Sequence, residues 1–121
     1  MAPATPPKPT ALVTGASSGI GEALAGCFAA AGHDLVLVAR SADKLHALAD
    51  TLQARHGVKV RVEPADLSEP QAVSALASRL GRARLQIDVL VNNAGVLAQG
   101  SFVRQGADVH QQMIDLNIAG L

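Results

Sequence analysis

The chain has 121 residues, 49% of them hydrophobic and 17% charged, which is typical of one globular domain. Ten basic residues balance ten acidic ones, so the chain lacks the positive charge that attracts nucleic acids or anionic membranes, and no apolar run reaches the roughly 20 residues of a transmembrane helix. The single cysteine, Cys27, fits a reducing compartment, and we therefore expect a cytoplasmic protein without a nucleic-acid or membrane partner.

Residues 1–9 contain four of the six prolines and lack the apolar stretch of a signal peptide. Proline has no backbone N–H for helix or sheet ladders, so this segment is predicted to be a flexible leader. Residues 10–121 are then expected to form a single domain.

From Thr10 onward, strand patterns alternate with helix patterns. Aliphatic runs predict strands at residues 10–14, 34–39, 58–62 and 87–91. Apolar residues at helical spacing predict four helices, with stripes at Ile20, Leu24, Phe28 and Ala31; Leu45, Leu48 and Leu52; Val73, Leu76 and Leu80; and Val109, Met113 and Leu116. This alternation predicts an α/β fold with a parallel sheet of about four strands and helices on both faces. The alternating 58–62 strand is predicted to lie at an edge.

Residues that start or stop helices support these boundaries. Ser41 and Ser68 are predicted to cap the second and third helices, and Pro70 fits the first turn of the third. Gly32 and Gly57 are predicted to end the first and second helices, because glycine readily adopts the left-handed conformation found there.

A glycine-rich turn joins the first strand to the first helix. It contains Gly15, Ser17, Ser18, Gly19, Ile20 and Gly21. Glycines leave room for close approach, and a helix that begins here directs unpaired N–H groups and a positive dipole end at the turn. This arrangement predicts a diphosphate site to which the two serine hydroxyls can add hydrogen bonds. It is not a P-loop, because no Gly-Lys-Ser/Thr follows.

The second strand ends in Val38-Ala39-Arg40. In dinucleotide-binding folds this strand tip meets the 2′ position of the adenosine ribose, where an acidic residue favours NAD. Here an arginine stands instead, and a guanidinium matches the geometry of a phosphate. The sequence therefore favours NADP(H), with NAD(H) as the alternative cofactor.

Further motifs follow the third and fourth strands: Asp66-Leu67, Asn92-Asn93-Ala94-Gly95, and Asn117 in the last predicted helix. Together with the G-x-x-x-G-x-G turn preceded by Thr14, they resemble the short-chain dehydrogenase/reductase family. The resemblance implies that Asp66 hydrogen-bonds the adenine amino group and that the backbone of Leu67 meets the ring. It also implies that, in the Asn92–Gly95 segment, one asparagine ties the strand to its neighbours while the Asn-Ala-Gly backbone lines the adenosine ribose. Asn117 would be the tetrad asparagine that supports a water in a proton relay.

The resemblance implies a Rossmann-type, doubly wound parallel sheet with strand order 3-2-1-4-5-6-7, of which residues 10–121 would form an incomplete N-terminal half. Hydride transfer between a nicotinamide and a small-molecule carbonyl or alcohol would need a Ser and a Tyr-x-x-x-Lys, but the chain has no tyrosine. These residues are expected beyond Leu121, which would make the chain a fragment of a homo-oligomeric enzyme and leave the fourth strand as an edge. The four histidines, His33, His46, His56 and His110, are expected at the surface, and no metal site is expected.

Two alternatives stay open. The chain can be complete as it stands and act as a non-catalytic nucleotide-binding or regulatory module, because the cleft between the first and fourth strands is fully encoded. It can also be a non-binding piece that pairs with another chain.

Overall fold

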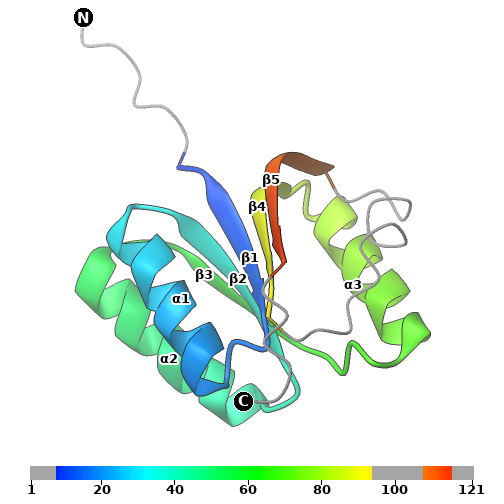
Figure 1. Ribbon diagram of the computed structural model, residues 1–121, viewed down its shortest axis with the longest axis horizontal. Coiled ribbons are helices and arrows are strands. Elements are labelled where there is room, and N and C mark those ends of the chain that lie inside the picture. Colours follow the sequence, from blue (N-terminus) through cyan, green and yellow to red (C-terminus); the bar gives the residue numbers. More distant parts are fainter. Residues whose placement is uncertain (1–7, 94–107, 116–121) are drawn as a thin grey trace, which may run out of the picture.

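The computed structural model describes residues 8–93 and 108–115. These residues contain five strands, which form a parallel sheet with the order β3-β2-β1-β4-β5, and three helices. The strands are β1 (Thr10–Thr14), β2 (Asp34–Ala39), β3 (Val60–Pro64), β4 (Gln86–Asn92) and β5 (Asp108–Asp115). The helices are α1 (Gly19–Ala30), α2 (Ala42–His56) and α3 (Pro70–Arg82). Helices α1 and α2 cover one face of the sheet and α3 covers the other (Figure 1). The α/β, doubly wound architecture is confirmed, with β3 at one edge as predicted.

Two apolar clusters, one on each face of the sheet, hold these layers together. Strand β1 contributes to both: Ala11 and Val13 face α1 and α2, Leu12 faces the side of α3, and all three are fully buried. Burial on both faces explains why the central strands are continuous aliphatic runs. The apolar stripe Val73, Leu76 and Leu80 of α3 is buried as predicted.

Most predicted helix boundaries are confirmed. The Ser41 hydroxyl accepts a hydrogen bond from the Lys44 N–H at 3.4 Å and caps α2, and Gly57 ends that helix with a φ of 68°. Gly32, with a φ of 89°, follows α1 immediately after its C-cap residue. Ahead of the sheet, the carbonyl of Pro9 accepts a hydrogen bond from the Asp34 N–H at 2.8 Å, which places Pro9 beside β2.

Three local predictions were wrong. The N-cap of α3 is Glu69, without a side-chain hydrogen bond, because the Ser68 hydroxyl donates to Asp66 instead. Ile20 is 39% exposed, since the small residues Gly21, Ala25 and Ala29 form the buried face of α1. Strand β3 begins at Val60 rather than at residue 58.

The largest correction concerns the last segment, which was predicted to be a helix. Residues Asp108–Asp115 form β5, which runs parallel to β4 with a register irregularity between Ile87 and Val89. Val109 and Met113 are four positions apart, a spacing that fits one helical turn. However, if β4 had no partner on this side, the backbone N–H and C=O groups of this buried strand would be unsatisfied. Pairing with β5 satisfies them, so β4 is not the edge strand that the sequence suggested.

Candidate functional site

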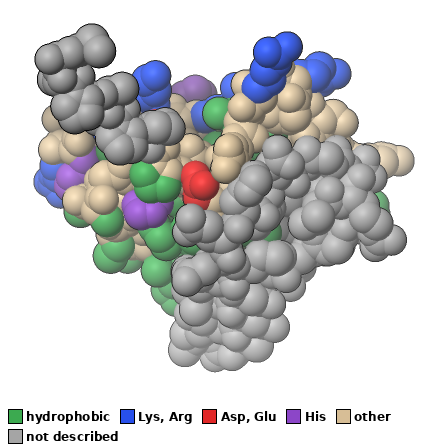
Figure 2. All heavy atoms as spheres, turned by 90° about the horizontal axis from the view of Figure 1, so that it is seen from above, with side chains coloured by type: hydrophobic (Ala, Val, Ile, Leu, Met, Phe, Trp, Pro, Cys, Tyr) green, Lys and Arg blue, Asp and Glu red, His purple; other side chains and the backbone are tan. Residues whose placement is uncertain are grey.

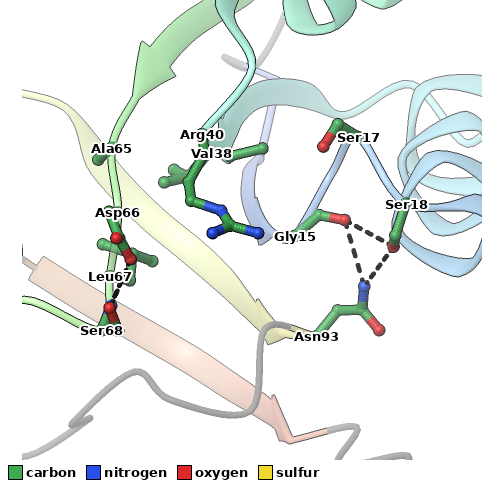
Figure 3. A pocket seen from close by; sticks show the side chains of 11 residues that line it. Gly15, Ser17, Ser18, Val38, Arg40, Ala65, Asp66, Leu67, Ser68 and Asn93 are labelled. Atoms are coloured by element: carbon green, nitrogen blue, oxygen red, sulfur yellow. Dashed lines mark hydrogen bonds between the residues drawn. The ribbon is translucent and has the colours of Figure 1, made fainter.

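A pocket of about 400 Å³ lies at the carboxyl ends of β1, β2 and β3 and beside the residue that follows β4. It is lined by Gly15, Ser17, Ser18, Val38, Ala39, Arg40, Ala65, Asp66, Leu67, Ser68 and Asn93. In doubly wound sheets, ligands bind at the carboxyl ends of the strands where the strand order reverses, which here is between β1 and β4. The pocket thus occupies the expected position and collects seven of the eleven predicted site residues that lie in the described part of the chain (Figure 3).

The glycine turn depends on a close approach between its two ends. Gly15 has a φ of 63°, a conformation that favours glycine. A Cβ at Gly21 would overlap the carbonyl oxygen of Gly15 and lie 2.7 Å from its carbonyl carbon. A Cβ at Gly19 would meet nothing within 4 Å. Gly21 therefore lets α1 begin against the turn, whereas Gly19 borders open space at the amino end of the helix.

Ser18 and Asn93 tie the turn to the end of β4. The Ser18 hydroxyl donates to the Gly15 carbonyl at 2.8 Å and accepts from the Gly21 N–H at 3.1 Å. The Asn93 amide donates to the Ser18 hydroxyl at 3.0 Å and to the Gly15 carbonyl at 3.3 Å (Figure 3). One donor and two lone pairs exhaust the capacity of a hydroxyl. Ser18 thus holds the turn in shape, and the Ser17 hydroxyl is the one that stays available to a ligand.

A second polar tie lies deeper, between β1 and β4. Thr14 is fully buried and Asn92 is 3% exposed. The Thr14 hydroxyl lies 3.2 Å from Oδ1 of Asn92 and 3.4 Å from the Val91 carbonyl. Asn92 does not line the pocket, and its Oδ1 lies against Thr14 of β1 instead. Thr14 was missed as a site residue; its signal was a polar side chain at the end of an aliphatic strand.

Arg40 lies at the tip of β2 and is exposed, with its guanidinium reaching toward the glycine turn in Figure 3. It is the one cation among the residues that line the pocket. A positive side chain beside backbone N–H groups at a helix start is an arrangement that attracts phosphate groups.

Asp66 forms the opposite wall with Leu67. Its Oδ1 accepts from the Ser68 hydroxyl at 2.6 Å and from the Ser68 N–H at 3.1 Å. These bonds, the hydroxyl first, lower the pKa of Asp66; desolvation opposes them, and the charge of Arg40 makes the smallest contribution, which also lowers the pKa. The exposed carboxylate is thus an ionised acceptor at neutral pH. Leu67 is 6% exposed and packs in the cluster beneath α3.

The sequence missed the remaining lining residues, Val38, Ala39, Ala65 and Ser68, which are the neighbours of predicted residues at two strand ends. Ala94, Gly95 and Asn117 lie outside the described residues. Ile20 lies in the first turn of α1, with its side chain exposed and outside the pocket lining.

The described part of the chain offers no cluster of three or more His, Cys, Asp or Glu side chains suited to a metal ion. Its helices are all too short or too polar to cross a membrane.

On the face at the amino ends of the strands, Lys and Arg side chains lie in separate places along the rim (Figure 2).

A glycine turn between β1 and α1, at the carboxyl edge of a doubly wound parallel sheet, defines a Rossmann-type fold. Residues 9–121 match the family model described as short chain dehydrogenase. The chain therefore belongs to the short-chain dehydrogenase family.

Individual relatives agree with this assignment. The chain is 42% identical over 112 residues to the oxidoreductase UcpA of Escherichia coli, covering 93% of this chain and 42% of that protein. A short-chain dehydrogenase from Sphingobium yanoikuyae, solved with NADPH, is 52% identical with a TM-score of 0.66, over 72% of this chain and 34% of that one. L-sorbose reductase from Gluconobacter frateurii, solved with NADPH and L-sorbose, is 42% identical with a TM-score of 0.68, over 73% and 34%. The chain spans less than half the length of these relatives.

Proposed function

We propose that this chain binds the ADP-ribose half of NADP(H), and that the whole protein to which it corresponds transfers a hydride between the nicotinamide and a small carbonyl or alcohol compound. The observation that carries the proposal is Arg40, which stands over the pocket between the glycine turn and Asp66. The structures solved with NADPH from Sphingobium yanoikuyae and Gluconobacter frateurii support the choice of cofactor.

The described residues fit the cofactor in three places. The amides at the start of α1 suit the diphosphate, and the open space beside Gly19 leaves room for it. The Arg40 guanidinium suits the 2′-phosphate, which NAD lacks. The ionised Asp66 suits the adenine amino group as a hydrogen-bond acceptor. When bound, the nicotinamide supplies or accepts the hydride, and the protein positions it.

The proton relay rests on the family resemblance. Asn117 is proposed as its asparagine, and the Ser and the Tyr-x-x-x-Lys are proposed for the part of the relatives that this chain does not span. Ala94 and Gly95 are proposed to line the ribose next to Asn93. A homo-oligomer and a small-molecule substrate are proposed for the whole protein on the same ground, and a cytoplasmic location is proposed from the single cysteine.

Calorimetry on the 121-residue chain tests the cofactor assignment. We expect NADPH to bind about tenfold or more tightly than NADH, because a charge-assisted hydrogen bond to the 2′-phosphate contributes about 1.5–3 kcal/mol. Dissociation constants above the millimolar range for both cofactors would overturn the proposal. Equal affinities would overturn the preference for NADP.

A second candidate is a nucleotide-binding module without catalysis. The observation that favours it is that Gly15, Arg40 and Asp66 surround one pocket, which is what nucleotide binding alone requires. Reading the gene past Leu121 separates the two: a Ser and a Tyr-x-x-x-Lys encoded downstream support the oxidoreductase, and their absence supports the module.

A further inference from the structure

A buried carboxylate outside the pocket makes two short ion pairs. Glu63 of β3 is 6% exposed. Its Oε1 lies 2.7 Å from Nε of Arg79 on α3, and its Oε2 lies 2.7 Å from Nε of Arg61 on β3. Each carboxylate oxygen therefore has one guanidinium partner, and the two arginines remain more than one-third exposed.

The ion pairs lie on the α3 face of the sheet. In the register of β3 with β2, Arg61 is opposite Val36 and Glu63 is opposite Val38, both of which belong to the apolar cluster beneath α3. The alternate residues Val60 and Val62 pack in the other cluster. Strand β3 thus presents an apolar face to α1 and α2 and a charged face to α3. On the charged face, Glu63 is buried and Arg61 is partly exposed.

Glu63 also stands at the base of the adenosine wall, the segment Ala65–Ser68 that lines the pocket. The ladder continues past Glu63: Pro64 is opposite Ala39, and the Ala65 N–H donates to the Ala39 carbonyl at 2.8 Å. Helix α3 begins at Pro70, directly after the wall. The Glu63–Arg79 ion pair therefore joins the strand before the wall to the helix after it.

Among the described residues, the Ala65 N–H bond to the Ala39 carbonyl fixes the first residue of the wall to the sheet, and the other hydrogen bonds of the wall stay within it or go to Glu69, which follows it. The hydrogen bonds of Asp66 go to Ser68, within the wall itself. Leu67 is held by apolar packing beneath α3, which sets the depth of one side chain but has little directionality. The Glu63–Arg79 pair supplies a directional bond between the two elements that bracket the wall.

We propose that Glu63 and Arg79 are positioning residues that hold the adenosine wall in its binding position, so that the affinity for adenine nucleotides depends on an ion pair outside the pocket. This inference rests on the proposed function for its ligand. Its probe is 2′,5′-ADP, which carries the adenine and 2′-phosphate without the nicotinamide.

The test uses the full chain and compares Arg79→Met with Arg82→Met. Arg82 lies in the same last turn of α3, is exposed, and has no ion pair among the described residues. We expect Arg79→Met to raise the dissociation constant of 2′,5′-ADP about fivefold to tenfold and Arg82→Met to leave it unchanged. Amide hydrogen exchange of residues 65–68, measured without ligand, should accelerate in the first variant only.

Arg79→Met leaves a buried carboxylate with one partner and can destabilise the fold. The double variant Glu63→Gln/Arg79→Met has no such charge, so its thermal stability should return toward that of the parent chain. If the pair positions the wall, the double variant still binds 2′,5′-ADP weakly, and Arg79→Lys, which keeps the charge, restores most of the affinity.

The outcomes separate the two proposals. A parent chain that fails to bind 2′,5′-ADP overturns the proposed function, while faster exchange in Arg79→Met would still support the positioning role. A double variant with the parent's affinity and exchange rates overturns that role.

Discussion

The two sides of the pocket are built in different ways. The phosphate side, Gly15 to Gly21, is a backbone turn that short side chains hold in place. The Ser18 hydroxyl makes all three of its hydrogen bonds within this turn or to Asn93, which ties the turn to β4. The adenosine side offers exposed side chains, Arg40 and Asp66. The contrast indicates that changes at a packed position of the phosphate side, such as Gly21, alter the fold and binding together, whereas changes on the adenosine side alter affinity and selectivity alone.

The largest expected effect comes from Gly21→Ala. The added methyl group would overlap the Gly15 carbonyl, and neither backbone can move without opening the turn. We expect the free energy of unfolding to fall by about 3 kcal/mol, with loss of NADPH binding. Thermal and urea denaturation measure this. Gly26→Ala in the same helix, where a Cβ meets nothing within 4 Å, is the control and should be neutral or stabilising.

Arg40→Met is expected to leave stability within about 0.5 kcal/mol, because the side chain is exposed. It should weaken NADPH binding by about 2 kcal/mol, roughly thirtyfold, through loss of a charge-assisted contact to the 2′-phosphate. Calorimetry with both cofactors makes the measurement. NADH affinity should barely change, and an equal loss for NADH and NADPH would show that Arg40 does not select between them. Arg55→Met, in the last turn of α2, is the control.

These contrasts also separate what the sequence could predict from what it could not. The glycine turn, the tip of β2 and Asp66 follow from local signals at strand ends, and the structure brings them to one pocket. Two of the three hydrogen bonds of the Ser18 hydroxyl are local, to Gly15 and Gly21, but the third comes from Asn93, 75 residues away, and needs the tertiary structure. The ion pair between Glu63 and Arg79 likewise needs the tertiary structure.

The same reason explains the error at Asp108–Asp115. Its spacing of apolar residues fits a helix, but the backbone groups of β4 are satisfied by a strand, and that requirement is visible only once the sheet is assembled. The wrong prediction that Ser68 caps α3 has a local cause. A serine two residues after an aspartate can donate to that carboxylate instead of capping the next helix.

Gly19→Ala tests the phosphate side without disturbing its packing, because the added methyl group contacts no other atom of the chain. A Cβ there meets nothing within 4 Å, so stability should stay the same or rise by up to about 1 kcal/mol. The methyl group would stand at the helix start, where the diphosphate is proposed to lie, and we expect about tenfold weaker NADPH binding by calorimetry. Unchanged affinity would mean that the diphosphate does not lie against Gly19.

The smallest effect belongs to Ser68→Ala. Removing the hydroxyl takes away the leading cause of the lowered pKa of Asp66, so that pKa should rise toward the ordinary aspartate value. Carbon-detected NMR titration of the carboxyl group measures it, with Ser17→Ala, on the opposite side of the pocket, as the control.

The sign of the pH dependence follows. A carboxyl whose pKa is depressed in the folded chain contributes stability above its unfolded pKa and loses it as pH falls through the folded value. In the parent chain, Asp66 therefore stays an acceptor into the acid range, and in Ser68→Ala it is protonated at higher pH. Affinity for 2′,5′-ADP at neutral pH should change little in this variant, but its decline on acidification should begin earlier. Identical acid profiles for the two proteins would mean that the adenine does not use the Asp66 carboxylate.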